Sequence, residues 1–374
     1  MPRAVKHLLI GSTEAYSGKS ATVLGVASQL RSHGFDIAYG KPIGTWVNEA
    51  SSVAEPTPTA GPIEDPDVDF MAQTLQLPPE RLRPPLMSLT AASIEAQLAK
   101  NGEQDYLQQI AEAYQNRGED LLLLEGPGTL DEGVLFGLDL PQIAETIDAA
   151  VLVVARFHSA LVVDSLLSAK HRLGQRLLGV IINDIPKAQL DMVQNSVVPY
   201  LERHGIAVLA LLPRTPLMRS ISVREMVTRL KAEVLCRSDR LDLMVESLSI
   251  GAMNVNSALR YFRKGTNMAV VTGGDRTDIQ LAALETSTQC LVLTGHLPPS
   301  PEILARAIDL EVPILSVDSD TLTTVELIDQ MFGQVRLHER AKVECAEQLM
   351  ATHLNLERLL SLLDLKLPVA ASQG

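Results

Sequence analysis

The chain has 374 residues, 46% of them hydrophobic and 21% charged, which is the usage of a globular protein long enough for two or three domains. Its net charge of -13 at pH 7 opposes binding to phosphate backbones, and its apolar runs are far shorter than the roughly 18 residues of a membrane-spanning helix, so we expect neither a nucleic-acid partner nor membrane insertion. The first residues lack the apolar core of a signal peptide and the three cysteines lie far apart, so we expect a cytoplasmic protein with reduced thiols.

The first part of the chain alternates short apolar runs with segments of helical period. This pattern is typical of an α/β fold in which helices connect parallel strands. We expect strands at residues 7–10, 37–43, 121–124, 149–155, 177–183 and 207–212, and helices at 21–33, 161–173 and 190–204. Residues 47–66, rich in Ser, Thr, Pro and Gly, break the alternation and predict a long loop, either a lid over a site or a tolerated insertion.

A second, smaller α/β domain is predicted at residues 216–335, after a first domain at residues 1–215. It begins with a polar helical stretch at 219–240. We then expect strands at 246–252, 268–272, 289–294 and 312–317, and helices at 256–264, 277–285, 301–310 and 321–332. Residues 336–374 are expected to form one long helix over 337–365 and a tail. The apolar stripe of this helix, from Leu349 to Leu363, either packs on the protein's own core or forms the interface of a homo-oligomer.

A phosphate-binding loop is the strongest motif. The sequence GSTEAYSGKS, at residues 11–20, lies between the first predicted strand and the first predicted helix. In such a loop backbone N–H groups surround an anion, the helix N-terminus adds positive potential, Lys19 neutralises phosphate oxygens and Ser20 holds Mg²⁺. Thr13 stands where the standard Walker pattern has glycine, and the alternative interpretation is a glycine-rich turn with a capping serine.

Three further motifs end predicted strands at the same edge of the sheet. Glu125 follows the apolar run 121–124, and its carboxylate would either face the loop and hold Mg²⁺ or merely cap the glycine turn after it. Lys41 would either stabilise a negatively charged intermediate beside the γ-phosphate or lie solvated at the surface. Asn183 has an amide that can pair with adenine, although Asn is common in strand-end turns.

Taken in order, these motifs resemble those of the dethiobiotin synthetase and cobyrinic acid amide synthase group of P-loop proteins. Thr13-Glu14 with Gly18-Lys19-Ser20, Lys41-Pro42, Glu125-Gly126-Pro127-Gly128 and the strand 179–183 carry the resemblance, which covers about residues 1–215. The loop is one residue longer than the synthetase form, Glu14 replaces the usual Asp, and Gly44-Thr45 does not reproduce the Thr-Gly of the family. Because residues 47–66 also lack a recognisable diaminononanoate segment, we do not expect biotin synthesis.

The resemblance implies an ATP site with Mg²⁺. It assigns catalytic roles to Lys19, Lys41 and Glu125. Oxygen atoms for the metal would come from Ser20, Glu125, Asp67 and Asp69, with Glu14 as a further acid. The nucleotide-binding set that it implies is Thr13, Glu14, Gly18, Lys19, Ser20, Ala21, Asn183 and Pro213.

The second domain carries a motif of its own, VVTGGDRTDI at residues 270–279. It resembles the DRTGG domain, which follows a synthetase-like domain in the amino-terminal, regulatory half of long phosphate acetyltransferases. Together the two resemblances cover about residues 1–335. Gly274, Asp275, Arg276 and Thr277, at a glycine turn before a helix, either form a second anion site or serve only the turn and the helix cap.

The resemblance as a whole implies a regulatory protein that binds ATP and Mg²⁺, with an unknown metabolite or protein as its further partner. The sequence contains no acetyl-transfer domain after residue 335, so we expect no acetyltransferase activity, whereas weak ATP hydrolysis is compatible with the motifs. One alternative is an ATP-dependent synthetase that activates a carboxylate or carbamate at Lys41, and another is a non-catalytic scaffold. Relatives of this kind usually self-associate, which implies a homo-oligomer.

Overall fold

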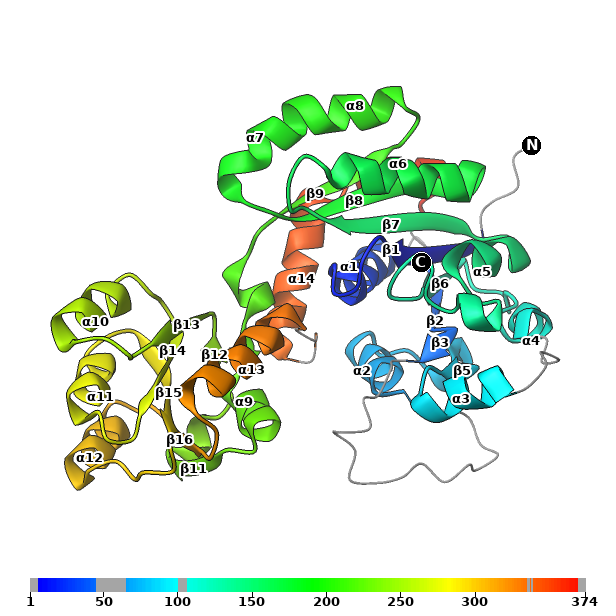
Figure 1. Ribbon diagram of the computed structural model, residues 1–374. Helices are drawn as coiled ribbons and strands as arrows, with labels where there is room; N and C mark the ends of the chain where they lie inside the picture. Colours follow the sequence, from blue (N-terminus) through cyan, green and yellow to red (C-terminus); the bar gives the residue numbers. More distant parts are fainter. Residues whose placement is uncertain (1–5, 45–64, 100–105, 335–336, 338, 369–374) are drawn as a thin grey trace, which may run out of the picture. The chain divides into compact units, whose positions relative to one another are not determined.

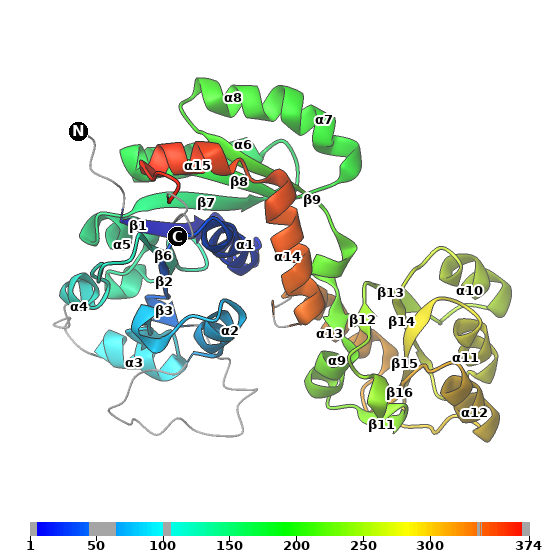
Figure 2. The same cartoon turned by 180° about the vertical axis from the view of Figure 1, so that it is seen from behind.

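The computed structural model describes residues 6–44, 65–99, 106–334, 337 and 339–368. The chain forms two compact units, one from residues 1–214 and 337–374 and the other from residues 215–336. Each unit is built around its own sheet, with helices on the faces of that sheet (Figures 1 and 2). The predicted α/β class is confirmed. Within the described residues, no helix combines the length and the apolar character that crossing a bilayer requires.

A sheet of seven parallel strands organises the first unit, in the order β4-β2-β6-β1-β7-β8-β9. Its strands are β1 (His7–Ser12), β2 (Ile37–Gly40), β4 (Leu82–Arg83), β6 (Leu121–Glu125), β7 (Ala150–Arg156), β8 (Leu177–Ile185) and β9 (Val208–Pro213). A separate parallel pair joins β3 (Ile43–Gly44) and β5 (Met87–Ser88). The central strands are almost entirely Leu, Val, Ile and Ala because helices cover both of their faces. Because β2, β6 and β1 are parallel neighbours, their carboxyl ends meet at one edge of the sheet.

The helices of the first unit divide between the two faces of this sheet. They are α1 (Lys19–Ser32), α2 (Pro66–Thr74), α3 (Ala91–Ala99), α4 (Tyr106–Ala113), α5 (Leu140–Thr146), α6 (Val162–Leu173), α7 (Leu190–Met192), α8 (Val198–Arg203), α14 (Arg340–His353) and α15 (Leu356–Leu363). Helices α4, α5, α6 and α8 pack on one face around a shared apolar core. Helix α1 lies on the other face, where α14 packs against it, and α14 and α15 contact β9 (Figure 2).

The prediction of one long C-terminal helix is wrong, because the segment forms two helices. Leu354 is extended between α14 and α15, and the Asn355 side chain caps α15 by accepting from the backbone N–H of Arg358. The Asn355 N–H itself donates to the Leu209 oxygen of β9. An Asn side chain that satisfies helix-end N–H groups favours a new helix start over continuation. The apolar stripe faces the first unit's own core, since Leu359, Leu360 and Leu363 are buried there.

The second unit has a five-stranded sheet in the order β11-β16-β15-β14-β13, in which only β11 is antiparallel. The strands are β11 (Glu233–Cys236), β13 (Ser247–Ile250), β14 (Met268–Gly273), β15 (Thr288–Thr294) and β16 (Ile314–Val317), and a separate pair joins β10 (Ile221–Ser222) to β12 (Met244–Val245). The helices are α9 (Val223–Leu230), α10 (Val255–Phe262), α11 (Thr277–Leu284), α12 (Pro301–Asp309) and α13 (Thr321–Gly333). One apolar core lies under α10, α11 and α12, and another lies under α9 and α13.

The prediction of a helical stretch at residues 219–240 is correct for α9 (Val223–Leu230) and wrong for the strands β10 and β11 on either side of it. Ser222 caps α9 by accepting from the Glu225 N–H, and the helix ends at Leu230, where Lys231 adopts a left-handed φ of 51°. The chain then enters strand β11, which pairs with β16. The sequence pattern could not anticipate this strand because its burial depends on the antiparallel partner.

No element is predicted from the pattern of residues 65–115, yet the described part of this range contains β4, β5 and the helices α2, α3 and α4. Strands of two residues carry too few side chains to show a period. The predicted loop at residues 47–66 lies outside the described part of the chain except for its last two residues. These two residues start α2, with Asp65 as the N-cap and Pro66 as the first helical residue.

Candidate functional site

The loop between β1 and α1 is arranged around the start of a helix. Gly18, at the N-cap of α1, has a φ of 94°, in the left-handed region that glycine adopts without strain. A Cβ at this position would lie 2.2 Å from Nδ2 of Asn183. Among the described residues no side chain caps α1, and its first turn contains no acid. The helix N-terminus therefore favours an external anion through its N–H groups and its dipole.

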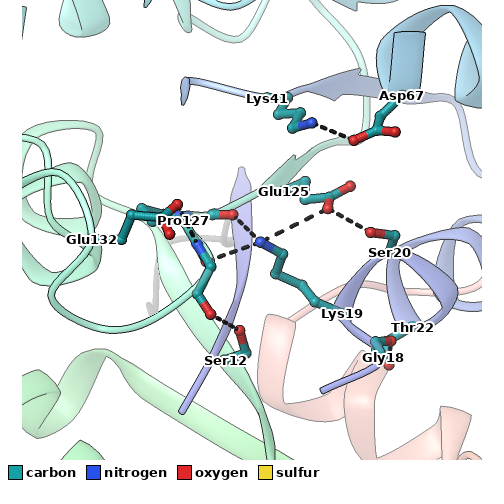
Figure 3. A network of polar contacts seen from close by, with 12 residues as sticks. Ser12, Gly18, Lys19, Ser20, Thr22, Lys41, Asp67, Glu125, Pro127 and Glu132 are labelled. Carbon is teal, nitrogen blue, oxygen red and sulfur yellow. Dashed lines mark hydrogen bonds and ion pairs between the residues drawn. The ribbon is translucent and has the colours of Figure 1, made fainter. Parts of the chain in front are cut away.

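Lys19 extends from α1 to the turn that follows β6 (Figure 3). Its Nζ donates to the backbone oxygens of Gly126 and Pro127 at 2.5 and 2.9 Å and lies 3.8 Å from Oε1 of Glu125. Burial lowers the pKa of Lys19, and the charge of Glu125 offsets this only in part. The hydrogen-bond acceptors that hold this ammonium are thus neutral carbonyls.

Glu125, the last residue of β6, accepts hydrogen bonds from two neighbouring elements. Ser20 Oγ donates to Oε1 at 2.8 Å, the Tyr39 hydroxyl donates to Oε2 at 3.1 Å, and Glu125 is 3% exposed. Burial and the charge of Glu125 raise the pKa of Tyr39 well above its ordinary value, so the phenol keeps its proton and donates. Ser20 and Glu125 place a hydroxyl and a carboxylate oxygen side by side, which is the ligand type that Mg²⁺ prefers.

Lys41, directly after β2, is buried against the first turn of α2 (Figure 3). Its Nζ lies 2.6 Å from Oδ2 of Asp67 and 3.1 Å from Oδ2 of Asp65. Burial alone would lower the pKa of Lys41, but the carboxylates of Glu125, Asp67 and Asp65 outweigh it and raise this pKa. Lys41 is 5% exposed, so it is not a solvated surface lysine.

Asn183 and Glu14, both predicted to bind the nucleotide, contact other groups of the protein. Nδ2 of Asn183 donates to the backbone oxygen of Ser17 at 2.8 Å and so braces the loop. The Glu14 carboxylate lies 2.9 Å from Nε2 of His158, at the exposed side of the same loop. Neither side chain contacts Lys19 in this structure, and their roles toward a nucleotide stay predictions.

The other predicted nucleotide and metal residues occupy different parts of the first unit. Thr13 belongs to the loop, Ala21 to the first turn of α1 and Pro213 to the end of β9. Asp69 is exposed on α2, and none of the contacts described for it joins it to Lys41 or Glu125. Lys19, Ser20, Lys41, Asp67 and Glu125 are thus the members of the predicted set that share one cluster (Figure 3).

Sequence reasoning missed Asp65 and Tyr39. Asp65 is 3% exposed and contacts Lys41, and the dipeptide Asp65-Pro66 is itself a helix-start signal that points to a capping carboxylate. Tyr39 precedes Lys41 by two residues, and alternate residues of a strand share a face, so strand period could have placed its hydroxyl near the same edge.

The loop also contains a polar atom that fits a bound ligand. Ser17 is 1% exposed, and its Oγ has no hydrogen-bond partner among the described residues. Buried hydroxyls normally have partners, so an oxygen of a loop-bound anion would complete this one. Within the same described residues, no three His, Cys, Asp or Glu side chains form a metal cage.

The glycine turn of the second unit is closed by its own chain. Nε2 of Gln280 donates to the backbone oxygens of Gly273 and Gly274, each at 3.0 Å. A Cβ on Gly274 would lie 2.2 Å from the backbone oxygen of Leu297. The glycine is therefore required by packing against the segment after β15.

The charged residues of this turn pair with each other. Nε of Arg276 donates to Asp278 at 3.1 Å, and its Nη2 donates to the Met253 oxygen at 2.9 Å. Arg276 itself is the N-cap of α11, which begins at Thr277, and no side chain of the described residues caps this helix, so the expected cap by Asp275 is not formed. With Asp275 and Asp278 adjacent, the guanidinium attracts an anion less strongly, and the second anion site stays a prediction.

Residues 6–222, more than half of the chain, match the AAA domain family. The chain belongs to this family. Residues 225–331 match the DRTGG domain, so the expected pairing of a P-loop domain with a DRTGG domain is confirmed. The segment at residues 11–20, which runs from the end of β1 into the first turn of α1, lies within the range that matches the AAA domain.

The chain is similar over nearly its whole length to phosphate acetyltransferases. The enzyme of Nitratidesulfovibrio vulgaris is 26% identical over 372 residues, covering 93% of this chain and 50% of that protein. The enzyme of Synechocystis is 26% identical over 381 residues, covering 95% and 51%. This chain thus spans about half the length of these relatives. The chain is also similar to a solved structure of the CBS and DRTGG domains from the regulatory region of Clostridium perfringens pyrophosphatase, complexed with diadenosine tetraphosphate. The sequences are 24% identical, the match covers 35% of this chain and 59% of that chain, and the TM-score is 0.27.

Proposed function

We propose that this protein binds ATP with Mg²⁺ in its AAA domain and acts as a regulatory protein whose DRTGG domain responds to a metabolite or a protein partner. The observation that carries the proposal is the convergence of Lys19, Ser20 and Glu125 at the carboxyl end of β6, beside an uncapped helix N-terminus. In this role Lys19 exchanges two neutral carbonyl acceptors for phosphate oxygens, which carry full charge and bind an ammonium more strongly.

Mg²⁺ would be held by the Ser20 hydroxyl and the Glu125 carboxylate, whose oxygens lie 2.8 Å apart. When bound, the cation neutralises phosphate charge. Tyr39 fixes the second oxygen of Glu125, so the first stays directed toward Ser20. The chain's own residues therefore orient a metal-side carboxylate before a ligand arrives.

Calorimetry tests the proposal with ATP and GTP, each with and without Mg²⁺, on wild type and Lys19→Ala. Lys187→Ala, an exposed lysine outside the cluster, is the matched control. We expect Mg²⁺-dependent ATP binding that the control retains and Lys19→Ala loses by at least about a hundredfold, as expected for a lost charge-assisted phosphate contact. Unchanged ATP affinity in Lys19→Ala would contradict the site.

An ATP-dependent synthetase is the second candidate, and the buried position of Lys41 near Glu125 favours it. ADP release, followed in the same samples, separates the two functions. Turnover that is negligible whatever small carboxylic acid or amine is added supports regulation. Rapid ADP release that requires one of them, and that Lys41→Ala abolishes, would establish the synthetase instead.

A further inference from the structure

Lys41 connects the end of β2 to the start of α2 through buried ion pairs. Its Nζ lies 2.6 Å from Asp67 and 3.1 Å from Asp65, although some two dozen residues separate them in sequence. Lys41 and Asp65 are 5% and 3% exposed. The Lys41–Asp65 pair is buried at both ends, whereas Asp67 is part-exposed. A buried pair is screened far less than a surface pair, and removing one partner leaves the other charge buried without compensation, so this pair links the two elements.

Asp65 links this ion pair to the integrity of α2. Its Oδ1 accepts from the backbone N–H groups of Asp67 and Val68 at 2.9 and 3.3 Å, which makes it the N-cap of the helix. The same carboxylate binds Lys41. When Lys41 moves away from Asp65, the residue that caps the first turn of α2 therefore loses its ion pair.

The two lysines of the site differ in what a phosphate must displace. Lys19 is hydrogen-bonded to neutral carbonyls, whereas Lys41 faces two carboxylates. Among the described residues, three carboxylates, including that of Glu125, face these two ammonium groups, so their summed charge is negative before any ligand binds. A triphosphate entering beside it repels these carboxylates and competes with them for Lys41.

We propose that Asp65, Asp67 and Lys41 form an ion-pair latch on α2 that the phosphates of a bound nucleotide open. The inference rests on the proposed function for the identity of the ligand. In the nucleotide-free protein the latch keeps the first turn of α2 ordered and lowers the affinity for phosphate. With ATP bound, Lys41 turns to phosphate oxygens and the first turn of α2 loosens, so nucleotide occupancy is transmitted to this helix.

Hydrogen exchange of the α2 amides with and without ATP and Mg²⁺ is the first test. Ligands ordinarily slow exchange near their site, but the latch predicts at least about threefold faster exchange in the first turn of α2 when ATP is bound. Slower or unchanged exchange in this turn at saturating ATP would overturn the latch.

Asp65→Asn is the sharpest variant, because Asn caps a helix about as well as Asp while it removes the charge that pairs with Lys41. We expect this variant and Asp67→Asn to bind Mg²⁺-free ATP about fivefold more tightly than wild type, the size expected for removing one like charge from a partly screened site. Glu95→Gln, an exposed change of the same charge on α3, is the control and should leave affinity within about twofold, as for a screened surface charge. If both aspartate variants bound ATP without Mg²⁺ as tightly as wild type or more weakly, the latch would be refuted. If only Asp67→Asn bound the ATP–Mg²⁺ complex more weakly, Asp67 would be a metal ligand instead.

A failure of the proposed function would look different. If wild type binds no nucleotide at all, that function fails, and opening by nucleotide fails with it. The resting ion pairs still predict faster exchange of the first turn of α2 in nucleotide-free Lys41→Met than in wild type. Equal exchange rates in these two proteins would show that the ion pairs do not hold α2.

Discussion

Glu125→Gln tests the centre of the site, because it removes one negative charge and nearly preserves the shape of the side chain. In the folded protein, Glu125 accepts from Ser20 and Tyr39 and lies 3.8 Å from the Lys19 ammonium. An amide has only one acceptor oxygen, so one of the two hydroxyl donors would face an NH₂ group.

The magnitude follows from these contacts. Hydrogen bonds to a charged group contribute about 1.5–3 kcal/mol each and neutral ones about 0.5–1.5 kcal/mol, so the two bonds together lose about 2 kcal/mol. Part of this loss is offset because a buried charge no longer has to be desolvated. We expect a net loss of about 1–2 kcal/mol in the free energy of unfolding, measured by urea denaturation, with Glu95→Gln as the control.

The effect of Glu125→Gln on ATP binding should have opposite signs with and without Mg²⁺. Without the cation, removing a like charge strengthens binding. With it, the loss of a carboxylate should reduce the Mg²⁺-induced gain in affinity by about tenfold or more, measured by calorimetry. If the Mg²⁺-induced gain matched that of wild type, Glu125 would not be on the metal side and the reasoning would be refuted.

Three other substitutions probe the surrounding structure. Gly18→Ala places a Cβ at a φ of 94° and against Asn183 Nδ2, so ATP binding in calorimetry should fall at least about tenfold, whereas retained affinity would show that the loop tolerates a side chain. Gly25→Ala puts a Cβ 2.1 Å from Met350 Cγ, and urea denaturation should show a loss of about 1–2 kcal/mol despite the better helix propensity of alanine. Hydrogen bonds from Arg358 lower the pKa of Glu202 in the folded protein. Such a carboxylate stabilises the fold at a pH above its ordinary pKa of 4.5, and this stability is lost as the pH falls through its lowered pKa in the folded protein. Arg358→Ala should thus lower the free energy of unfolding by about 0.5–1 kcal/mol at pH 7 and by almost nothing at pH 3. The value at pH 7 is small because both side chains are about one-third exposed, so solvent screens the pair. An equal loss at both pH values would contradict the ion pair.

The first unit's central strands could be predicted because each is a short apolar run bounded by turns. The position of the site followed from the same pattern, since the carboxyl ends of parallel strands share an edge, and Lys19, Ser20, Lys41 and Glu125 all lie at that edge. Local sequence was sufficient here because Lys41 directly follows β2, Glu125 ends β6, and Lys19 and Ser20 begin the helix that the glycine loop after β1 leads into.

The rest depended on contacts between distant segments. Asp65 becomes a site residue only because α2 returns its first turn to Lys41, and no periodicity records that approach. The break between α14 and α15 depends on a hydrogen bond from Asn355 to β9, which a helical apolar stripe does not reveal. Strand β11 likewise needs β16 as its partner. In each case a tertiary contact overrides the local pattern.

The affinity of the wild-type chain for ATP, measured by calorimetry with and without Mg²⁺, tests the central claim most directly. The proposed site predicts binding that Mg²⁺ strengthens by at least about tenfold, because the three carboxylates around Lys19 and Lys41 oppose a bare triphosphate. Absence of ATP binding in the presence of Mg²⁺, or equal affinity without it, would contradict the account.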